Sequence, residues 1–360
     1  MVVKQHQLPT LTALRGLAAW WVVVYHFRDA LGLSNGNPLL NVLAQGYLAV
    51  DFFFVLSGFV IFLAYEHDFA KFTMRTWAIF MTRRLARIYP LHLIILCAFL
   101  LNPLAIHYFS KSGVIDGRYN VIYFVASLVL VQNWGFFDEL AWNIPAWSIS
   151  TEFAAYLAFP VVLLLVRRLC RGIVTHFVAC ALAAVLLALI FKYSQCMTIG
   201  DKITYLGPVR CLLEFSIGAV AGNLFKRHAL FTQSTGRQFA ASIIGVWALS
   251  WAMDLPDFVY VPTVFGLAVL VFANTAVQKM PVLTSSTMVF LGEISYSTYL
   301  VHFLVKDWIK FFSHSVDWIS FTYYIFFVFS VSVLLYFYIE KPGRTWGNRL
   351  IFRKYPDSIV

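Results

Sequence analysis

Residues 46–65 read GYLAVDFFFVLSGFVIFLAY, a run of twenty residues that contains a single charged side chain, Asp51. A membrane-spanning α-helix needs about 20 largely apolar residues, so this stretch predicts one crossing. The chain of 360 residues is 61% hydrophobic and only 12% charged. Because a soluble domain carries about 25% charged residues, this composition indicates an integral membrane protein.

The same pattern recurs along the chain and predicts an all-α polytopic membrane protein with one domain over residues 1–360. We expect about ten transmembrane helices around a central polar cavity, with one further apolar stretch at 120–134 that is short for a crossing. The predicted spans lie near 11–30, 46–65, 88–108, 145–166, 177–196, 207–225, 238–254, 258–277, 289–311 and 319–339.

Positive charge gathers in short runs between the apolar stretches. These runs lie at 71–87, 167–171, 226–227 and 341–354. Cytoplasmic loops of membrane proteins carry such an excess of Lys and Arg, so the pattern predicts a multi-pass protein of a bacterial inner membrane with both termini in the cytoplasm. That topology requires an even number of crossings and makes 120–134 a re-entrant or interfacial segment. The net charge of +10 is explained in this way without a nucleic-acid partner.

Ionisable side chains inside the predicted spans are the first candidates for function, because burying charge in a bilayer is costly. Arg15 and His26 are eleven residues apart, close to three helical turns, so they share one helix face about 16 Å apart along the axis. Depth counted along the other spans places Asp51, Glu152, Glu214 and His302 in the outer half with His26. We therefore expect one polar cavity there, in which a histidine beside a carboxylate acts as general base.

A second polar signal precedes the third predicted span, in the segment RRLARIYP. Arg84 and Arg87 are three residues apart and share a face if the segment is helical. Guanidinium groups suit phosphate oxygens, so these residues and Arg15 predict a basic mouth for a nucleotide pyrophosphate. The sequence has no glycine-rich phosphate loop, and no group of histidines has the spacing of a zinc site.

Taken together and in order, these motifs resemble acyltransferase family 3, the bacterial membrane O-acyltransferases of surface glycans. The matching elements are the Arg15-to-His26 spacing, GYLAVDFFFVLSGFVI with Asp51 and Ser57, the Arg84/Arg87 pair, WSISTEF with Glu152, RCLLEFSIGA with Arg210 and Glu214, GEISYSTYLVH with Tyr296 and His302, and EKP with Glu340. They extend from residue 11 to residue 342.

The resemblance implies an acyl-CoA donor, acetyl-CoA by default, bound from the cytoplasm, and a glycan or lipid-linked sugar acceptor presented from the other side. It also implies that Arg15 and His26 are needed for activity. The chain ends soon after its last predicted span, so we expect no fused extracytoplasmic domain of the kind that some relatives carry. The candidate catalytic residues are His26, Glu152, Asp51 and His302, and the candidate donor-binding residues are Arg15, Arg84, Arg87, Ser57 and Tyr296.

Other interpretations stay open at this level. Arg210 and Glu214, four residues apart, fit an internal ion pair that fixes the bundle. The buried ionisable groups also fit a proton-coupled secondary transporter, although no inverted repeat is evident, and a non-catalytic scaffold is a third class. The acceptor, the acyl group, the oligomeric state and the choice between direct transfer and an acyl-enzyme are not determined.

Overall fold

The computed structural model describes residues 8–34, 36–109, 117–228, 241, 243, 245–250, 252–274, 280–313 and 316–354, and all regular secondary structure in these ranges is helical. The all-α prediction is thereby confirmed. The helices that carry the candidate site are α1 (Pro9–Phe27), α3 (Ala49–Tyr65), α4 (Met74–Ala98), α7 (Trp147–Leu169), α9 (Ile203–Arg227), α13 (Ser295–Phe312) and α15 (Lys341–Lys354). The others are α2 (Pro38–Ala44), α5 (Leu101–Phe109), α6 (Val121–Leu128), α8 (Ile173–Tyr193), α11 (Asp257–Ala273), α12 (Ser286–Glu293) and α14 (Trp318–Leu335), with a π-helical turn at Tyr336–Glu340 and short 3₁₀ turns between helices.

Six described helices are long and apolar enough to cross a membrane, or seven if the bent pair α12 and α13 counts as one span. The 17-residue α11 is apolar but shorter, and α1 does not belong to the six. Residues 238–240, 242, 244 and 251 of the predicted span 238–254 lie outside the described residues, so this span is described only in part. The chain is therefore a polytopic membrane protein, and the number of ten full crossings stays a prediction.

The third predicted span, 88–108, lies within a longer apolar helical stretch, Met74–Tyr108, that starts earlier than the span. Helix α4 begins at Met74, where the Thr73 side chain accepts a hydrogen bond of 3.1 Å from the Thr76 amide and caps the helix. The arginines that were expected in a loop are thus inside a helix, and Arg84 and Arg87 lie on its same side.

The structure divides the predicted span 289–311 between two helices. Helices α12 and α13 are bent by 62° where they meet at Ile294. At the bend, a Cβ added to Gly292 would lie 1.8 Å from the Thr12 carbonyl oxygen of α1. The backbones of α1 and α12 are therefore in direct contact, which only glycine allows.

The segment 120–134 does not cross the membrane as a helix. Helix α6 has eight residues, about 12 Å in length. The chain after it folds back against α7, where the Ser150 hydroxyl donates to the Leu130 carbonyl at 2.8 Å and accepts from the Asn133 amide at 3.1 Å. These bonds satisfy non-helical backbone inside the protein, as a re-entrant segment requires.

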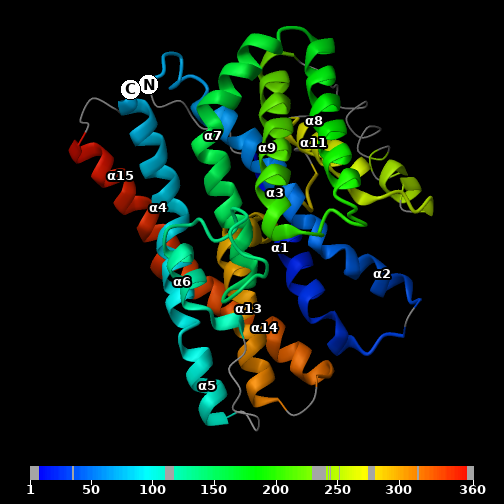
Figure 1. The fold of residues 1–360 in the computed structure, drawn as a ribbon, viewed down its shortest axis with the longest axis vertical. Coiled ribbons are helices and arrows are strands. Elements are labelled where there is room, and N and C mark those ends of the chain that lie inside the picture. Colours follow the sequence, from blue (N-terminus) through cyan, green and yellow to red (C-terminus); the bar gives the residue numbers. More distant parts are fainter. Residues whose placement is uncertain are drawn as a thin grey trace.

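The core of the bundle is the crossing of α3 and α9, which Figure 1 shows near the centre of the molecule. A Cβ on Gly58 would lie 1.9 Å from the Phe215 carbonyl oxygen, and one on Gly218 would lie 1.9 Å from the Val55 carbonyl oxygen. Small residues of this kind let membrane helices approach backbone to backbone. Helix α8, by contrast, has only 17% of its apolar window buried and so presents most of its surface outward.

One end of the bundle collects basic side chains from several helices, and we call it the basic end. Glu66, at the end of α3, forms ion pairs with Arg167 of α7 and Lys226 of α9. The C-terminal ends of three helices therefore meet on one side. The two helices α4 and α15 run beside each other toward that end (Figure 1).

We predict that Gly218→Ala prevents or severely weakens folding. The added methyl group would overlap a backbone oxygen that cannot move without displacing α3, so the loss should reach or exceed the upper end of the roughly 1–3 kcal/mol typical of overpacking. Thermal unfolding and size-exclusion profiles of protein purified in detergent would measure it. Gly117→Ala is the matched control, since a Cβ at Gly117 meets nothing within 4 Å; equal behaviour of the two variants would contradict the prediction.

Candidate active site

Arg15 of α1 lies at the bend between α12 and α13. Its Nε and Nη2 atoms donate to the Gly292 carbonyl at 3.1 and 2.5 Å, and Nε also donates to the Ser295 hydroxyl at 2.9 Å. The bend frees this carbonyl from regular helical bonding, and Arg15 supplies the missing donors. Part of the guanidinium expected to bind donor phosphates is thus committed to the protein backbone.

His26, at the other end of α1, stacks on His302 of α13. Their ring centroids are 5.1 Å apart with the planes 29° from parallel, and Phe303 meets His26 edge to face at 5.4 Å. Both Arg15 and His26 therefore contact α13, which confirms that they share a face. The carboxylate expected beside His26 is not found there: among the described residues, its charged neighbours are His302, Lys306 and Arg28.

The hydrogen bond of His302 defines its tautomer. Its Nδ1 atom lies 2.5 Å from the Tyr299 carbonyl oxygen, which can only accept, so Nδ1 carries the proton when the ring is neutral. Its Nε2 atom is buried and has no hydrogen-bond partner among the described residues. His26 likewise has no hydrogen bond to a described residue. The two rings thus offer unengaged nitrogen atoms at one place.

Tyr296 and Tyr299 lie three residues apart on α13 and lead from the histidines toward the basic end. The Tyr299 hydroxyl is 2.9 Å from the Ser148 hydroxyl and donates to the Pro145 carbonyl at 3.0 Å. The Tyr296 hydroxyl donates to the Ile88 carbonyl of α4 at 2.7 Å. These bonds join α13 to its neighbours, so the Tyr296 hydroxyl is engaged in packing against α4.

Glu152 is not beside the histidines. Its Oε1 atom accepts a bond of 2.5 Å from the Ser57 hydroxyl of α3, and Glu152 is among the charged groups that act on Arg84. Arg84 in turn donates to the Tyr65 hydroxyl at 3.1 Å and stacks over that ring. Ser57, Glu152 and Arg84 thus form one polar group between the histidines and the basic end. Glu152 belongs to it because α7 packs against α3 beside Ser57.

Asp51 and Arg210 form a fully buried, two-pronged ion pair between α3 and α9. The Nε and Nη2 atoms of Arg210 each donate at 2.6 Å to one oxygen of Asp51. Glu214, also fully buried, lies beside the pair without bonding to Arg210. The expected Arg210–Glu214 ion pair is therefore wrong in its partner, since the α3–α9 crossing brings Asp51 closer. Of the five residues expected in one cavity, His26 lies with His302, Asp51 lies with Glu214, and Glu152 bonds to Ser57. The shared cavity stays a prediction.

The arginines at the basic end form the second half of the site. Arg344, Arg15 and Arg84 are the cations with the largest electrostatic effect on Arg87, and Glu340 opposes them. Arg87 makes no hydrogen bond or ion pair to a described residue, whereas Arg344 pairs with Glu340. Sequence reasoning missed Arg344, although its place four residues after the glutamate of EKP was a usable signal.

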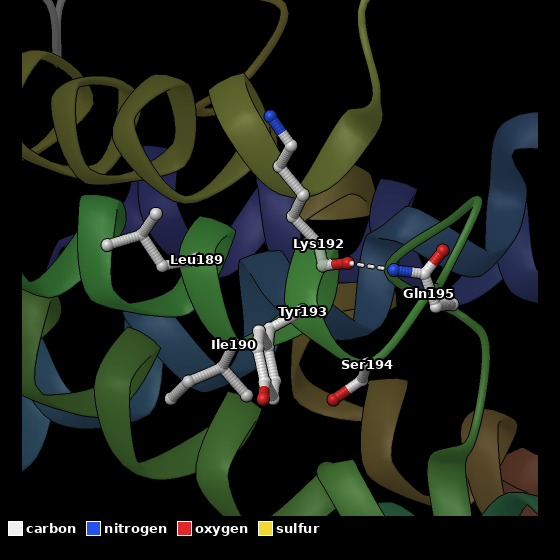
Figure 2. Close-up of a pocket in the computed structure, with 6 residues that line it drawn as sticks. All are labelled: Leu189, Ile190, Lys192, Tyr193, Ser194 and Gln195. Atoms are coloured by element: carbon white, nitrogen blue, oxygen red, sulfur yellow. Dashed lines mark hydrogen bonds between the residues drawn. The ribbon is translucent and has the colours of Figure 1, made fainter.

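One surface hollow lies away from these residues. Figure 2 shows it at the end of α8, lined by Leu189, Ile190, Lys192, Tyr193, Ser194 and Gln195. All six belong to one short stretch of chain, and none contacts the candidate site. We therefore locate the chemistry inside the bundle. No cluster of three metal-ligating side chains occurs among the residues that the structure describes.

Comparison with known proteins bears on this arrangement directly. The family profile described as an acyltransferase domain, acyltransferase 3, matches residues 8–337. The chain belongs to acyltransferase family 3. It is therefore an enzyme, a membrane acyltransferase that acylates groups other than aminoacyl groups, and not a transporter or a scaffold.

Two relatives illustrate the range of this family. The acyltransferase MdmB of Streptomyces mycarofaciens is 31% identical over 321 residues, covering 83% of this chain and 79% of its own. The O-acetyltransferase OatA of Staphylococcus aureus is 25% identical, covering 94% of this chain and 58% of its own. The chain thus spans about three fifths of the staphylococcal relative's length. No solved structure matches the chain.

We predict that Asp51→Ala destabilises the protein by about 3–5 kcal/mol, because it leaves the buried Arg210 guanidinium without its counter-charge. Thermal unfolding in detergent would measure the change. Lys226→Ala, which removes an ion pair at a half-exposed lysine, is the control and should cost less than about 1 kcal/mol. A similar loss in both variants would show that the buried pair has no special weight.

Proposed function

We propose that the protein transfers an acetyl group from acetyl-CoA, bound at the basic end, to a hydroxyl group placed beside His26. The observation that carries the proposal is the parallel packing of α1 and α13. Arg15 contacts Ser295 at one end of the contact, and His26 stacks on His302 at the other. Along α1, Arg15 and His26 are about 16 Å apart, a length that an extended pantetheine arm covers.

In this proposal the arginines bind the nucleotide end of the donor. Arg87 has no hydrogen bond or ion pair to a described residue, and the charges of Arg344, Arg15 and Arg84 act on it. Guanidinium groups bind phosphate oxygens through paired hydrogen bonds. Arg15, committed to the bend at Gly292, holds α13 in place and adds charge to the same mouth.

At His26, the imidazole removes the proton of the acceptor hydroxyl as its oxygen attacks the thioester carbonyl carbon. The carbon–sulfur bond then breaks, and the CoA thiolate leaves with the proton from the imidazolium. A general base is needed at this step, because an alcohol alone is too weak a nucleophile. His302 supports the His26 ring by stacking, and its own unengaged Nε2 atom lies at the same position. We favour direct transfer over an acyl-histidine intermediate.

A positive charge is available for the developing oxyanion. Lys306, one turn beyond His302 on α13, is the first cation among the charged neighbours of His26, and its ammonium lies 3.6 Å from the centre of the Phe303 ring. A fixed charge aimed at an oxyanion in a water-poor site is worth more than in water.

The acceptor that we propose is a sugar hydroxyl of a glycan or of a lipid-linked precursor outside the cytoplasm. The O-acetyltransferase name of the staphylococcal relative supports O-acetylation. The basic end supports a cytoplasmic position for the donor site and for both termini in a bacterial inner membrane, since positive charge collects on that side.

We predict that His26→Ala lowers transfer from acetyl-CoA by about 10²–10⁴-fold, the usual contribution of a general base. Radiolabel transferred from acetyl-CoA to glycan would be counted in membranes that contain equal amounts of protein. His67→Ala, at an exposed histidine, is the control and should behave as wild type. Full activity of the His26 variant would remove this residue from the chemistry.

Arg87→Ala should raise the KM for acetyl-CoA about tenfold or more while kcat changes little, because it removes donor binding and not the base. Initial rates at varied acetyl-CoA concentration would separate the two constants. Arg83, one turn earlier on α4, pairs with Asp68 at 3.8 Å and provides the matched control, Arg83→Ala. A lowered kcat with unchanged KM would place Arg87 outside the donor site.

A further inference from the structure

Helix α15 packs against α4 through two glycines one turn apart. A Cβ on Gly347 would lie 2.2 Å from the Ala86 Cβ, and one on Gly343 would lie 3.1 Å from the Pro90 ring. Small residues four apart on a helix permit such a close approach. Ala86 lies between Arg84 and Arg87, so this glycine face brings α15 directly to the arginines of α4.

This packing places Arg344 of α15 near Arg87 of α4. Among the charged groups that act on Arg87, Arg344 has the largest electrostatic effect. The register of α15 follows from the π-helical turn Tyr336–Glu340 just before it. A π turn holds one extra residue, and one residue rotates the helix face that follows by about 100°.

In the part of the chain that the structure describes, the arginines near Arg87 are not each paired with a carboxylate of their own. Glu340 uses one oxygen for Arg344 and accepts a bond of 2.8 Å from the Ser297 hydroxyl on the other. The Nε atoms of Arg84 and Arg344 are buried without an acceptor among the described residues, and Arg87 has no polar partner there. Phosphate oxygens placed among these arginines would supply the acceptors that the described residues do not.

We propose that Arg344 of α15 binds the phosphate groups of the acyl-CoA donor together with Arg87. Helix α15 is then one wall of the donor site, and α4 is the opposite wall. The inference rests on the proposed function, because it concerns the same donor. A planar guanidinium on each wall can bind phosphate oxygens in pairs, which lysine at the same place would do less well.

The test is equilibrium binding of radiolabelled acetyl-CoA to the full-length protein in lipid nanodiscs, which needs no acceptor. Arg344→Ala should weaken binding about tenfold or more, and Arg344→Lys should restore part of it. Arg349→Ala is the matched control on an exposed face of the same helix and should bind as wild type. Thermal unfolding of each variant would confirm that it is folded.

Glu340→Gln separates binding from a merely structural ion pair. It removes the charge that holds Arg344 and leaves Arg344 in place, so binding should not weaken. If Glu340→Gln weakens binding as much as Arg344→Ala, Arg344 acts only through its ion pair and the inference is wrong. Unchanged binding by Arg344→Ala overturns it as well. If wild type itself binds no acetyl-CoA, the proposed function fails, an outcome distinct from failure of the inference alone.

Discussion

Backbone contact between α3 and α9 is the constraint on which the rest of the structure depends. Gly58 and Gly218 leave no room for a Cβ at the crossing. Two turns away on each helix, Asp51 and Arg210 meet in a fully buried ion pair. The close approach fixes the distance between the two charged groups, and the pair fixes the rotation of the two helices about the crossing. Since a buried pair adds specificity more readily than stability, we attribute the register of the core to it.

The polar side chains inside the bundle divide into two kinds. Arg15, Arg210 and Tyr296 have their donors satisfied by backbone or carboxylate oxygens, and each joins two helices. His26 and Arg87 have no such partner among the described residues. Both residues are partly exposed, so their polar atoms are accessible to a ligand. Whether a polar side chain has a partner within the protein, more than its depth in the membrane, separates structural residues from candidates for catalysis or ligand binding.

The sequence predicted the all-helical membrane fold and the shared face of Arg15 and His26, because apolar length and helical periodicity are local properties. It failed where several helices meet. The bend at Ile294 depends on contact between Gly292 and Thr12, which lie far apart in the chain. Counting depth along separate spans placed Glu152 with the histidines, although α7 carries it to Ser57. Depth alone contains no information on which helix faces which.

The sequence by itself therefore determined the class of the protein, its helical periodicity and, through an ordered set of motifs, the family to which it belongs. Tertiary structure alone decided which side chains meet. His302 stacks on His26, Asp51 forms the ion pair with Arg210, and Arg344 lies near Arg87. The physical reason is that a membrane helix must satisfy its own backbone internally, which is a local condition. The pairing of side chains between helices depends instead on where glycine permits two backbones to touch.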